Sequence, residues 1–178
     1  MRTGSGAPVP HLPWGLKSGT VLPDMTHQTP RKPVLLVVDD QPSNIQVLHQ
    51  IFKTDHEVFM ATSGEQALTF CATQLPDLIL LDVIMPGLNG HQVCVKLKSD
   101  PRTQDIPVIF VTGHSNPEDE SEGLRLGAVD FISKPVNAAT VRARVKVQLM
   151  LRQSLRQVQE LNESLEDRVV LRTAELRQ

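Results

Sequence analysis

Residues 34–40 read VLLVVDD, five apolar residues followed directly by two aspartates. Residues 77–82 repeat this arrangement as DLILLD, in which the apolar run ends at Asp82. A short run that is continuously apolar is typical of a strand buried on both faces of a sheet. The chain has three further apolar runs, EVFMA at 57–61, PVIFV at 107–111 and AVDFI at 128–132. Together the runs predict five strands between residues 33 and 136.

Helix-like segments separate these runs. Pro42 suits the first turn of a helix, Ser63 and Gln66 have the spacing of a capping box, and Asn116–Pro117 precedes an acidic first turn. The fourth segment is weakly specified, because Gly123 interrupts it and few apolar residues anchor it. Strands that alternate with helices predict an α/β domain whose parallel sheet is covered by helices on both faces.

Residues 137–178 contain no proline and no glycine and predict one long helix. Its apolar residues recur at spacings of three and four, as in a coiled coil. A single Asn at an a position favours a parallel two-stranded pair, so we expect a homodimer through this helix; the alternative is a surface helix packed on its own domain. The a positions are Leu155, Asn162, Val169 and Leu176, and the d positions are Leu151, Val158, Leu165 and Arg172.

The charge of the chain is unevenly distributed. The 178 residues include 18 Lys plus Arg and 20 Asp plus Glu, a net charge of -2. Residues 33–136 alone carry six basic and fourteen acidic residues. The nearly neutral total gives no indication of a nucleic-acid or membrane partner, and the crowded carboxylates call for a compensating cation.

The two ends of the chain differ from the middle. Residues 1–32 are rich in proline and glycine and lack hydrophobic periodicity, as in a disordered leader or a sequence added for expression. We therefore expect a domain at 33–147 and a coiled-coil helix at 148–178. Cys71 and Cys94 lack the spacing of a zinc site, so we interpret them as buried thiols of a cytoplasmic protein. No apolar run is long enough to span a membrane.

Polar residues follow four of the five predicted strands: Asp39–Asp40, Asp82, Thr112 and Lys134. The carboxyl ends of parallel strands meet at one sheet edge, where α/β proteins bind their ligands. Three carboxylates placed there predict a site for a hard divalent cation, and Mg²⁺ suits such a site. With the metal bound, Asp82 could attack a phosphoryl group, while Lys134 and Thr112 would contact the phosphoryl oxygens.

This set of residues, in this order and spacing, resembles the receiver domain of two-component response regulators over residues 33 to about 147. The resemblance implies a flavodoxin-like, doubly wound sheet of strand order 2-1-3-4-5. It also implies that Asp82 is the phosphoacceptor and Lys134 the family's lysine. Asp39 and Asp40 would be the acidic pair, with Asp40 the more direct metal ligand and the carbonyl of Ile84 a further one. Thr112 and Phe131 would form the switch.

Two positions near the site vary within this family and are thought to tune the lifetime of the phosphoryl group. Ile84, two residues after Asp82, offers no polar group to orient a water molecule, which favours a long lifetime. His114 lies two residues after Thr112, and its alternative interpretation is an ordinary loop residue.

The resemblance implies that a sensor histidine kinase or a phosphotransfer protein supplies the phosphoryl group. The chain itself is then expected to signal and not to act as an enzyme. Residues 165–176, LEDRVVLRTAEL, resemble the helical linker that joins receivers to diguanylate cyclase, cyclic-di-GMP phosphodiesterase or histidine kinase modules.

Two other functions are compatible with parts of the sequence. A DNA-binding regulator could use the basic C-terminal helix, but its basic residues are mixed with acidic ones and no helix-turn-helix follows. A phosphatase with an aspartyl nucleophile, of the haloacid dehalogenase type, would carry a DxD pattern on the first strand, where this chain has Asp39, Asp40 and Gln41.

Overall fold

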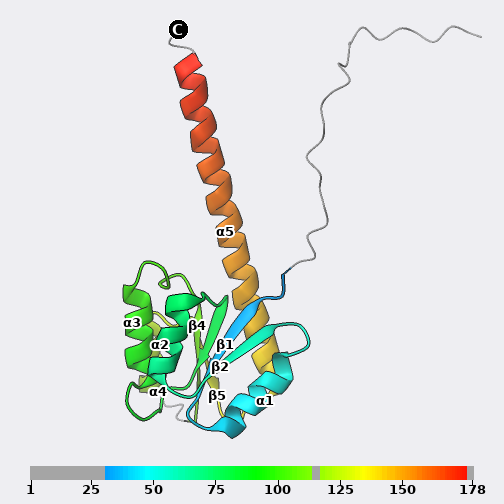
Figure 1. Cartoon of the computed structure of the whole chain (residues 1–178), viewed down its shortest axis with the longest axis vertical. Helices are drawn as coiled ribbons and strands as arrows, with labels where there is room; N and C mark the ends of the chain where they lie inside the picture. The colour runs from blue at the N-terminus through cyan, green and yellow to red at the C-terminus, as the bar shows by residue number, and fades with distance from the viewer. Residues whose placement is uncertain (1–30, 114–116, 176–178) are drawn as a thin grey trace, which may run out of the picture. The chain divides into compact units, whose positions relative to one another are not determined.

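The computed structural model describes residues 31–113 and 117–175, and it contains a five-stranded sheet flanked by five helices (Figure 1). The predicted alternation of strands and helices is confirmed. The strands are β1 (Val34–Val38), β2 (Glu57–Ala61), β3 (Leu78–Leu81), β4 (Val108–Thr112) and β5 (Asp130–Ser133). The helices are α1 (Pro42–Phe52), α2 (Gly64–Thr73), α3 (Gly90–Ser99), α4 (Pro117–Arg125) and α5 (Ala138–Glu175).

All neighbouring strands are parallel, in the order β2-β1-β3-β4-β5, which confirms the flavodoxin-like topology. The register places Val38 of β1 beside Leu81 of β3, so the residues that follow these strands lie at the same edge. Thr112 of β4 likewise pairs with Ser133 of β5. The sheet therefore brings the four predicted polar positions to one edge.

Each face of the sheet buries a separate apolar cluster. Leu35 and Val37 of β1 face one cluster with α1 and α5, and Leu36 and Val38 face the other with α2 and α3. Strands β1, β3 and β4 are fully buried, as their continuous apolar runs predict. Each fully buried Leu or Ile contributes about 1.5–3 kcal/mol, so the two clusters stabilise the sheet whose edge carries the polar positions.

The helix start signals are mostly confirmed. Pro42 is the first residue of α1, and the Ser63 hydroxyl accepts a hydrogen bond from the backbone N–H of Gln66 at the start of α2. The Gln66 side chain accepts from the N–H of Thr62 and not from that of Ser63, so the predicted capping box is displaced by one residue. Residues 114–116, which include the predicted cap Asn116, lie outside the described residues.

Gly123 does not interrupt α4. It is buried inside the helix, and a Cβ atom there would lie 2.5 Å from Cε2 of Phe131. Its role is therefore to let α4 approach an aromatic ring, and the sequence pattern alone gave no sign of that contact.

Helix α5 begins at Ala138 and continues to Glu175, within one residue of its predicted start. Val141 and Val145 are buried against the sheet and Leu149 is partly buried, whereas Leu151, Leu155, Val158 and Leu165 are exposed. The predicted boundary between residues 147 and 148 falls inside this helix and stays a prediction. Almost all of the predicted leader lies outside the described residues.

Two smaller expectations can be compared with the structure. Cys71 and Cys94 are buried thiols, as expected. In the described parts of the chain, we find no helix that is both long and apolar enough to cross a membrane.

Candidate functional site

The candidate site lies at the carboxyl edge of the sheet, where residues from four strand ends meet. Asp39 follows β1, Asp82 follows β3, Thr112 ends β4 and Lys134 follows β5. Asp39, Asp82 and Thr112 are all buried. The structure thus brings together the three predicted strand-end carboxylates and the predicted lysine.

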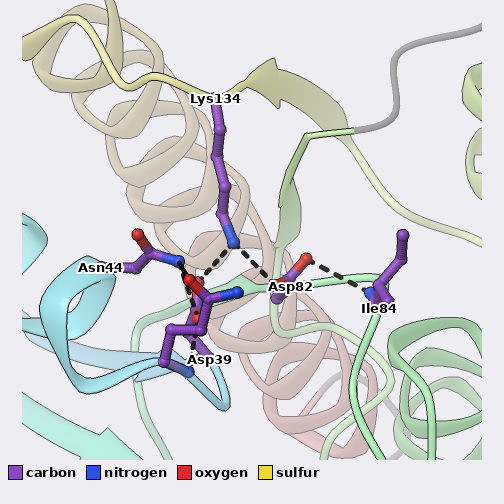
Figure 2. A network of polar contacts seen from close by, with 6 residues as sticks. Asp39, Asn44, Asp82, Ile84 and Lys134 are labelled. Atoms are coloured by element: carbon purple, nitrogen blue, oxygen red, sulfur yellow. Dashed lines mark hydrogen bonds and ion pairs between the residues drawn. The ribbon is translucent and has the colours of Figure 1, made fainter.

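The ammonium group of Lys134 bridges two aspartates (Figure 2). Its Nζ atom lies 2.6 Å from Oδ2 of Asp39 and 2.7 Å from Oδ2 of Asp82. The Lys134 side chain is 17% exposed, so the bridge is largely shielded from solvent. One cation therefore offsets part of the negative charge that the sheet edge collects.

Asp39 has hydrogen bonds at both carboxylate oxygens. Its Oδ1 accepts from the N–H of Gln41 at 2.9 Å and from Nδ2 of Asn44 at 3.0 Å, and its Oδ2 accepts from Lys134 (Figure 2). Asn44 lies in the first turn of α1 and was missed by sequence reasoning. Its place five residues after Asp39 could have indicated it. A helix that starts directly after a strand places the polar residues of its first turn near the end of that strand.

Asp82 is held by its own loop. The N–H of Ile84 donates to Oδ1 at 3.2 Å, and the N–H of Asp82 donates to the carbonyl of Val38 at 2.8 Å. Burial raises the pKa of Asp82, although the hydrogen bond and charge of Lys134 oppose this change. Burial also acts to lower the pKa of Lys134, but its bonds to Asp39 and Asp82 outweigh that effect and the pKa is raised.

Two glycines shape the loop after Asp82. Gly87 has φ of +76°, a conformation that L side chains rarely adopt. A Cβ atom at Gly90 would lie only 2.2 Å from the carbonyl oxygen of Asp82, so α3 can start this close to the site only with glycine there. No sequence spacing identified Gly90, because its constraint is a contact with the backbone of Asp82.

Asp40 has the free oxygen that a metal ion would need. One ligand oxygen from each of Asp39, Asp40 and Asp82 lies within 4.8 Å of the others. Oδ1 of Asp40 is buried, and among the described residues it has no hydrogen-bond partner. A buried, unpartnered carboxylate oxygen beside two other carboxylates fits a hard divalent cation.

The predicted switch residues lie beside the site. Thr112 is buried, while the Phe131 ring is partly buried and packs 5.1 Å, centroid to centroid, from the ring of Phe110. Ile84 directs its side chain outward, with 53% of its surface exposed. His114 lies outside the described residues, so its predicted tuning role cannot be compared with the structure.

The predicted dimer seam follows one exposed face of α5. Leu151, Leu155, Val158 and Leu165 are between 48% and 58% exposed, and Asn162 is exposed among them. Val169 belongs to α5, whereas Leu176 lies outside the described residues. The structure contains one copy of the chain, so the seam stays a prediction.

Two curated relatives match most of this chain but only part of their own length. A protein of Vibrio cholerae named as a probable cyclic di-GMP phosphodiesterase is 42% identical over 142 residues, which cover 80% of this chain and 32% of that protein. Response regulator PleD of Caulobacter vibrioides is 44% identical over 113 residues, which cover 63% of this chain and 25% of that protein. The chain thus spans a third or less of these relatives.

Solved structures of similar fold also match this chain. The receiver domain of a signal transduction histidine kinase from Syntrophus aciditrophicus is 35% identical with a TM-score of 0.62, and it covers 66% of this chain and 90% of its own. Chemotaxis protein CheY4 of Vibrio cholerae is 27% identical with a TM-score of 0.62, covering 64% of this chain and 96% of its own.

The family model that matches is the response regulator receiver domain, over residues 35–146. This range begins inside β1, ends inside α5 and includes every residue of the acidic site. The chain belongs to the response regulator receiver domains, the signalling domains of two-component systems.

Proposed function

We propose that Asp82 accepts a phosphoryl group from a sensor histidine kinase or a phosphotransfer protein, in a reaction that requires Mg²⁺. The observation that carries this proposal is the position of Asp82, which is buried, accepts a hydrogen bond from the Lys134 ammonium and clusters with Asp39 and Asp40, whose Oδ1 has no partner among the described residues. A carboxylate in these surroundings has a cation bonded to it and further carboxylates close enough to share a metal ion with it.

The reaction is a transfer between two nucleophiles. An oxygen of Asp82 forms a bond to phosphorus while the bond from phosphorus to the donor's histidine nitrogen breaks. The electron pair of that bond stays on the imidazole, which takes up a proton. When bound, Mg²⁺ would offset the charge of the carboxylates and of the phosphoryl oxygens.

The chain's own residues prepare Asp82 for this reaction. The Ile84 N–H fixes Oδ1, and the bridge from Lys134 holds Oδ2 beside Asp39. Lys134 is close enough to bind a phosphoryl oxygen once one is attached to Asp82, and Thr112 would bind another. Asp40 and the carbonyl of Ile84, with Asp39 and Asp82, would hold the metal. The side chains of Ile84 and His114 would set how fast water removes the phosphoryl group.

Switching would start at Thr112 and pass through Phe131 to α5. The N–H of Phe131 donates to Oδ1 of Asp130 at 2.8 Å, and Arg144 of α5 forms an ion pair with the same oxygen. A movement of Phe131 would therefore alter the contact between β5 and α5. Two copies of α5 would pair through the predicted seam and pass the signal to an output module outside this chain.

The kind of output module is proposed from the name of a relative. The Vibrio cholerae relative is named for cyclic di-GMP hydrolysis, and its match covers 80% of this chain. We infer that the output is a cyclic di-GMP enzyme, that this chain is its regulatory part without catalysis of its own, and that the protein works in the cytoplasm beside its kinase.

The test is phosphorylation by acetyl phosphate with Mg²⁺, followed by intact mass measurement. We expect one adduct of ~80 Da on the wild type, none on Asp82→Asn, and an unchanged adduct on the control Asp105→Asn, whose side chain is exposed and distant in the chain. An adduct that persists on Asp82→Asn would overturn the proposal. Repeated turnover of a phosphate monoester would favour the phosphatase alternative, and a salt-dependent shift of duplex DNA would favour the DNA-binding one.

A further inference from the structure

Three ring side chains from three different elements are in contact beside the site. The imidazole of His91, the second residue of α3, lies edge-on to the ring of Phe110 on β4, with 5.2 Å between the ring centroids. Phe110 lies 5.1 Å, centroid to centroid, from Phe131, its partner in the register of β4 and β5. The proposed switch residue Phe131 is therefore connected to α3 through the fully buried ring of Phe110.

His91 is also tied to the loop that carries Asp82. It directly follows Gly90, where a Cβ atom would lie only 2.2 Å from the carbonyl oxygen of Asp82. The N–H of Gly90 donates to the carbonyl of Val83 at 2.9 Å. A shift of the loop after Asp82 therefore acts on the first turn of α3, and so on the ring of His91.

One ring nitrogen of His91 is buried without a partner. Its Nε2 atom is shielded from solvent, and among the described residues it has no hydrogen-bond partner. Such an atom costs free energy, because folding has removed it from water and has given it no hydrogen bond in exchange. Since water cannot reach Nε2 in this arrangement, only a movement of the protein can supply a partner.

Helix α4 is the neighbouring element that is least firmly attached. The thiol of Cys94, one turn after His91, donates to the carbonyl of Leu126 just after α4, with 3.7 Å between the two atoms. One turn before Leu126, a Cβ atom at Gly123 would lie 3.0 Å from Phe110, so α4 covers the ring that His91 contacts. Among the α4 residues whose burial is described, Gly123 alone is buried, and an element held by so little buried surface moves readily.

We infer that His91 is a positioning residue of the switch and that its imidazole favours the phosphorylated arrangement of the domain. This inference rests on the proposed phosphorylation of Asp82. When Phe131 and α4 rearrange, Nε2 of His91 gains a hydrogen bond to α4 or to water that the movement admits. The unphosphorylated arrangement alone then bears the cost of the unpartnered nitrogen. The imidazole therefore shifts the equilibrium towards the phosphorylated arrangement.

The first test compares His91→Phe with the control His56→Phe in the full chain. Phe keeps an aromatic ring beside Phe110 and removes the nitrogen. His56 is a matched control, because it also packs edge-on against a phenylalanine, 5.2 Å from Phe52, and its Nδ1 is likewise buried without a partner among the described residues. It precedes β2, at the opposite end of the sheet from the site. Beryllofluoride with Mg²⁺ serves as the mimic of the phosphoryl group, and its apparent Kd is measured together with stability in urea.

We expect His91→Phe to raise the apparent Kd for beryllofluoride about tenfold, the size of effect that one unsatisfied buried polar atom provides. Without the mimic, its free energy of unfolding should equal or exceed that of the wild type, because the unpartnered nitrogen is gone. His56→Phe should leave the Kd unchanged. An unchanged Kd in His91→Phe would overturn the inference, and so would a raised Kd that comes with a loss of stability, the sign of a damaged core.

The ¹⁵N chemical shift of Nε2 tests the hydrogen bond itself. The signal of His91 is identified as the one that is missing from the spectrum of His91→Phe. Mg²⁺ and beryllofluoride should move this signal towards the value of a hydrogen-bonded nitrogen in the wild type and leave it unmoved in Asp82→Asn. A signal that stays the same in the wild type, although the mimic binds, would contradict the inference alone. If the wild type does not bind the mimic, the proposed phosphorylation fails and the inference fails with it.

Discussion

The ammonium of Lys134 lies 2.6 Å from Oδ2 of Asp39, although 95 residues separate them in the chain. The same nitrogen contacts Asp82, so one cation balances two buried carboxylates. If a buried carboxylate loses its cationic partner, nothing offsets the free energy that was spent in removing the carboxylate from water. Lys134 should therefore support the folded domain as well as the proposed reaction.

Replacing Lys134 by Gln should lower the free energy of unfolding by about 3 kcal/mol, because Asp39 and Asp82 would remain buried without a cation. Millimolar Mg²⁺ should restore part of this loss by binding the carboxylates. Urea unfolding with and without Mg²⁺ measures both effects. The exposed Lys96→Gln serves as the control, and equal stability of the two variants would contradict the prediction.

Replacing Gly123 by Ala should destabilise the domain by about 1–3 kcal/mol, the usual range for overpacking. The new Cβ would lie 2.5 Å from Phe131 and 3.0 Å from Phe110. In an open helix the same change would stabilise by about 1 kcal/mol. Denaturant unfolding shows whether the substitution lowers or raises the free energy of unfolding. If the ring is the cause, the double variant Gly123→Ala with Phe131→Ala should lose little more than Phe131→Ala alone.

Replacing Arg152 by Ala should weaken the attachment of α5 more than replacing Arg156. Arg152 is partly buried and donates to two backbone carbonyls, which are worth about 1 kcal/mol each. Arg156 is 51% exposed at its ion pair with Asp77, and such pairs contribute about 0–1 kcal/mol. Hydrogen exchange of the amides near Leu149 measures the attachment. These amides should exchange faster in Arg152→Ala than in Arg156→Ala, and the reverse order would contradict the prediction.

His56 should make the domain less stable in mild acid. Its side chain is 13% exposed and packs edge-on against Phe52, and burial lowers its pKa from 6.5. Below that value the unfolded chain binds a proton that the folded chain resists, so the contribution of neutral His56 is full above pH 6.5 and is lost as the pH falls.

The variant His56→Gln should remove this part of the pH dependence. Unfolding free energies of both proteins at about pH 7.5 and about pH 5.5 give the comparison, and the higher pH isolates the effect of the substitution itself. An identical fall in stability for both proteins would mean that other groups cause it.

The sequence by itself determined the layered fold and the location of the site. Continuous apolar runs identify buried strands, because a strand covered on both faces has no polar side. Asp39, Asp82 and Lys134 could be assigned to one edge, because parallel strands share the direction of their ends. The strand ends also placed Asp40 in the predicted cation site, whereas only the family resemblance made it the more direct ligand, and the structure adds its unpartnered oxygen.

Only the tertiary structure decided which side chains touch. The spacing of residues does not show that Asn44 reaches Asp39, that Gly90 lies against the carbonyl of Asp82, or that Arg152 binds beside β3. Gly123 looked like a helix break for the same reason. Periodicity reports which face of an element is apolar, but the contact of Gly123 with Phe131 depends on how two elements pack, and that is fixed by three-dimensional fit.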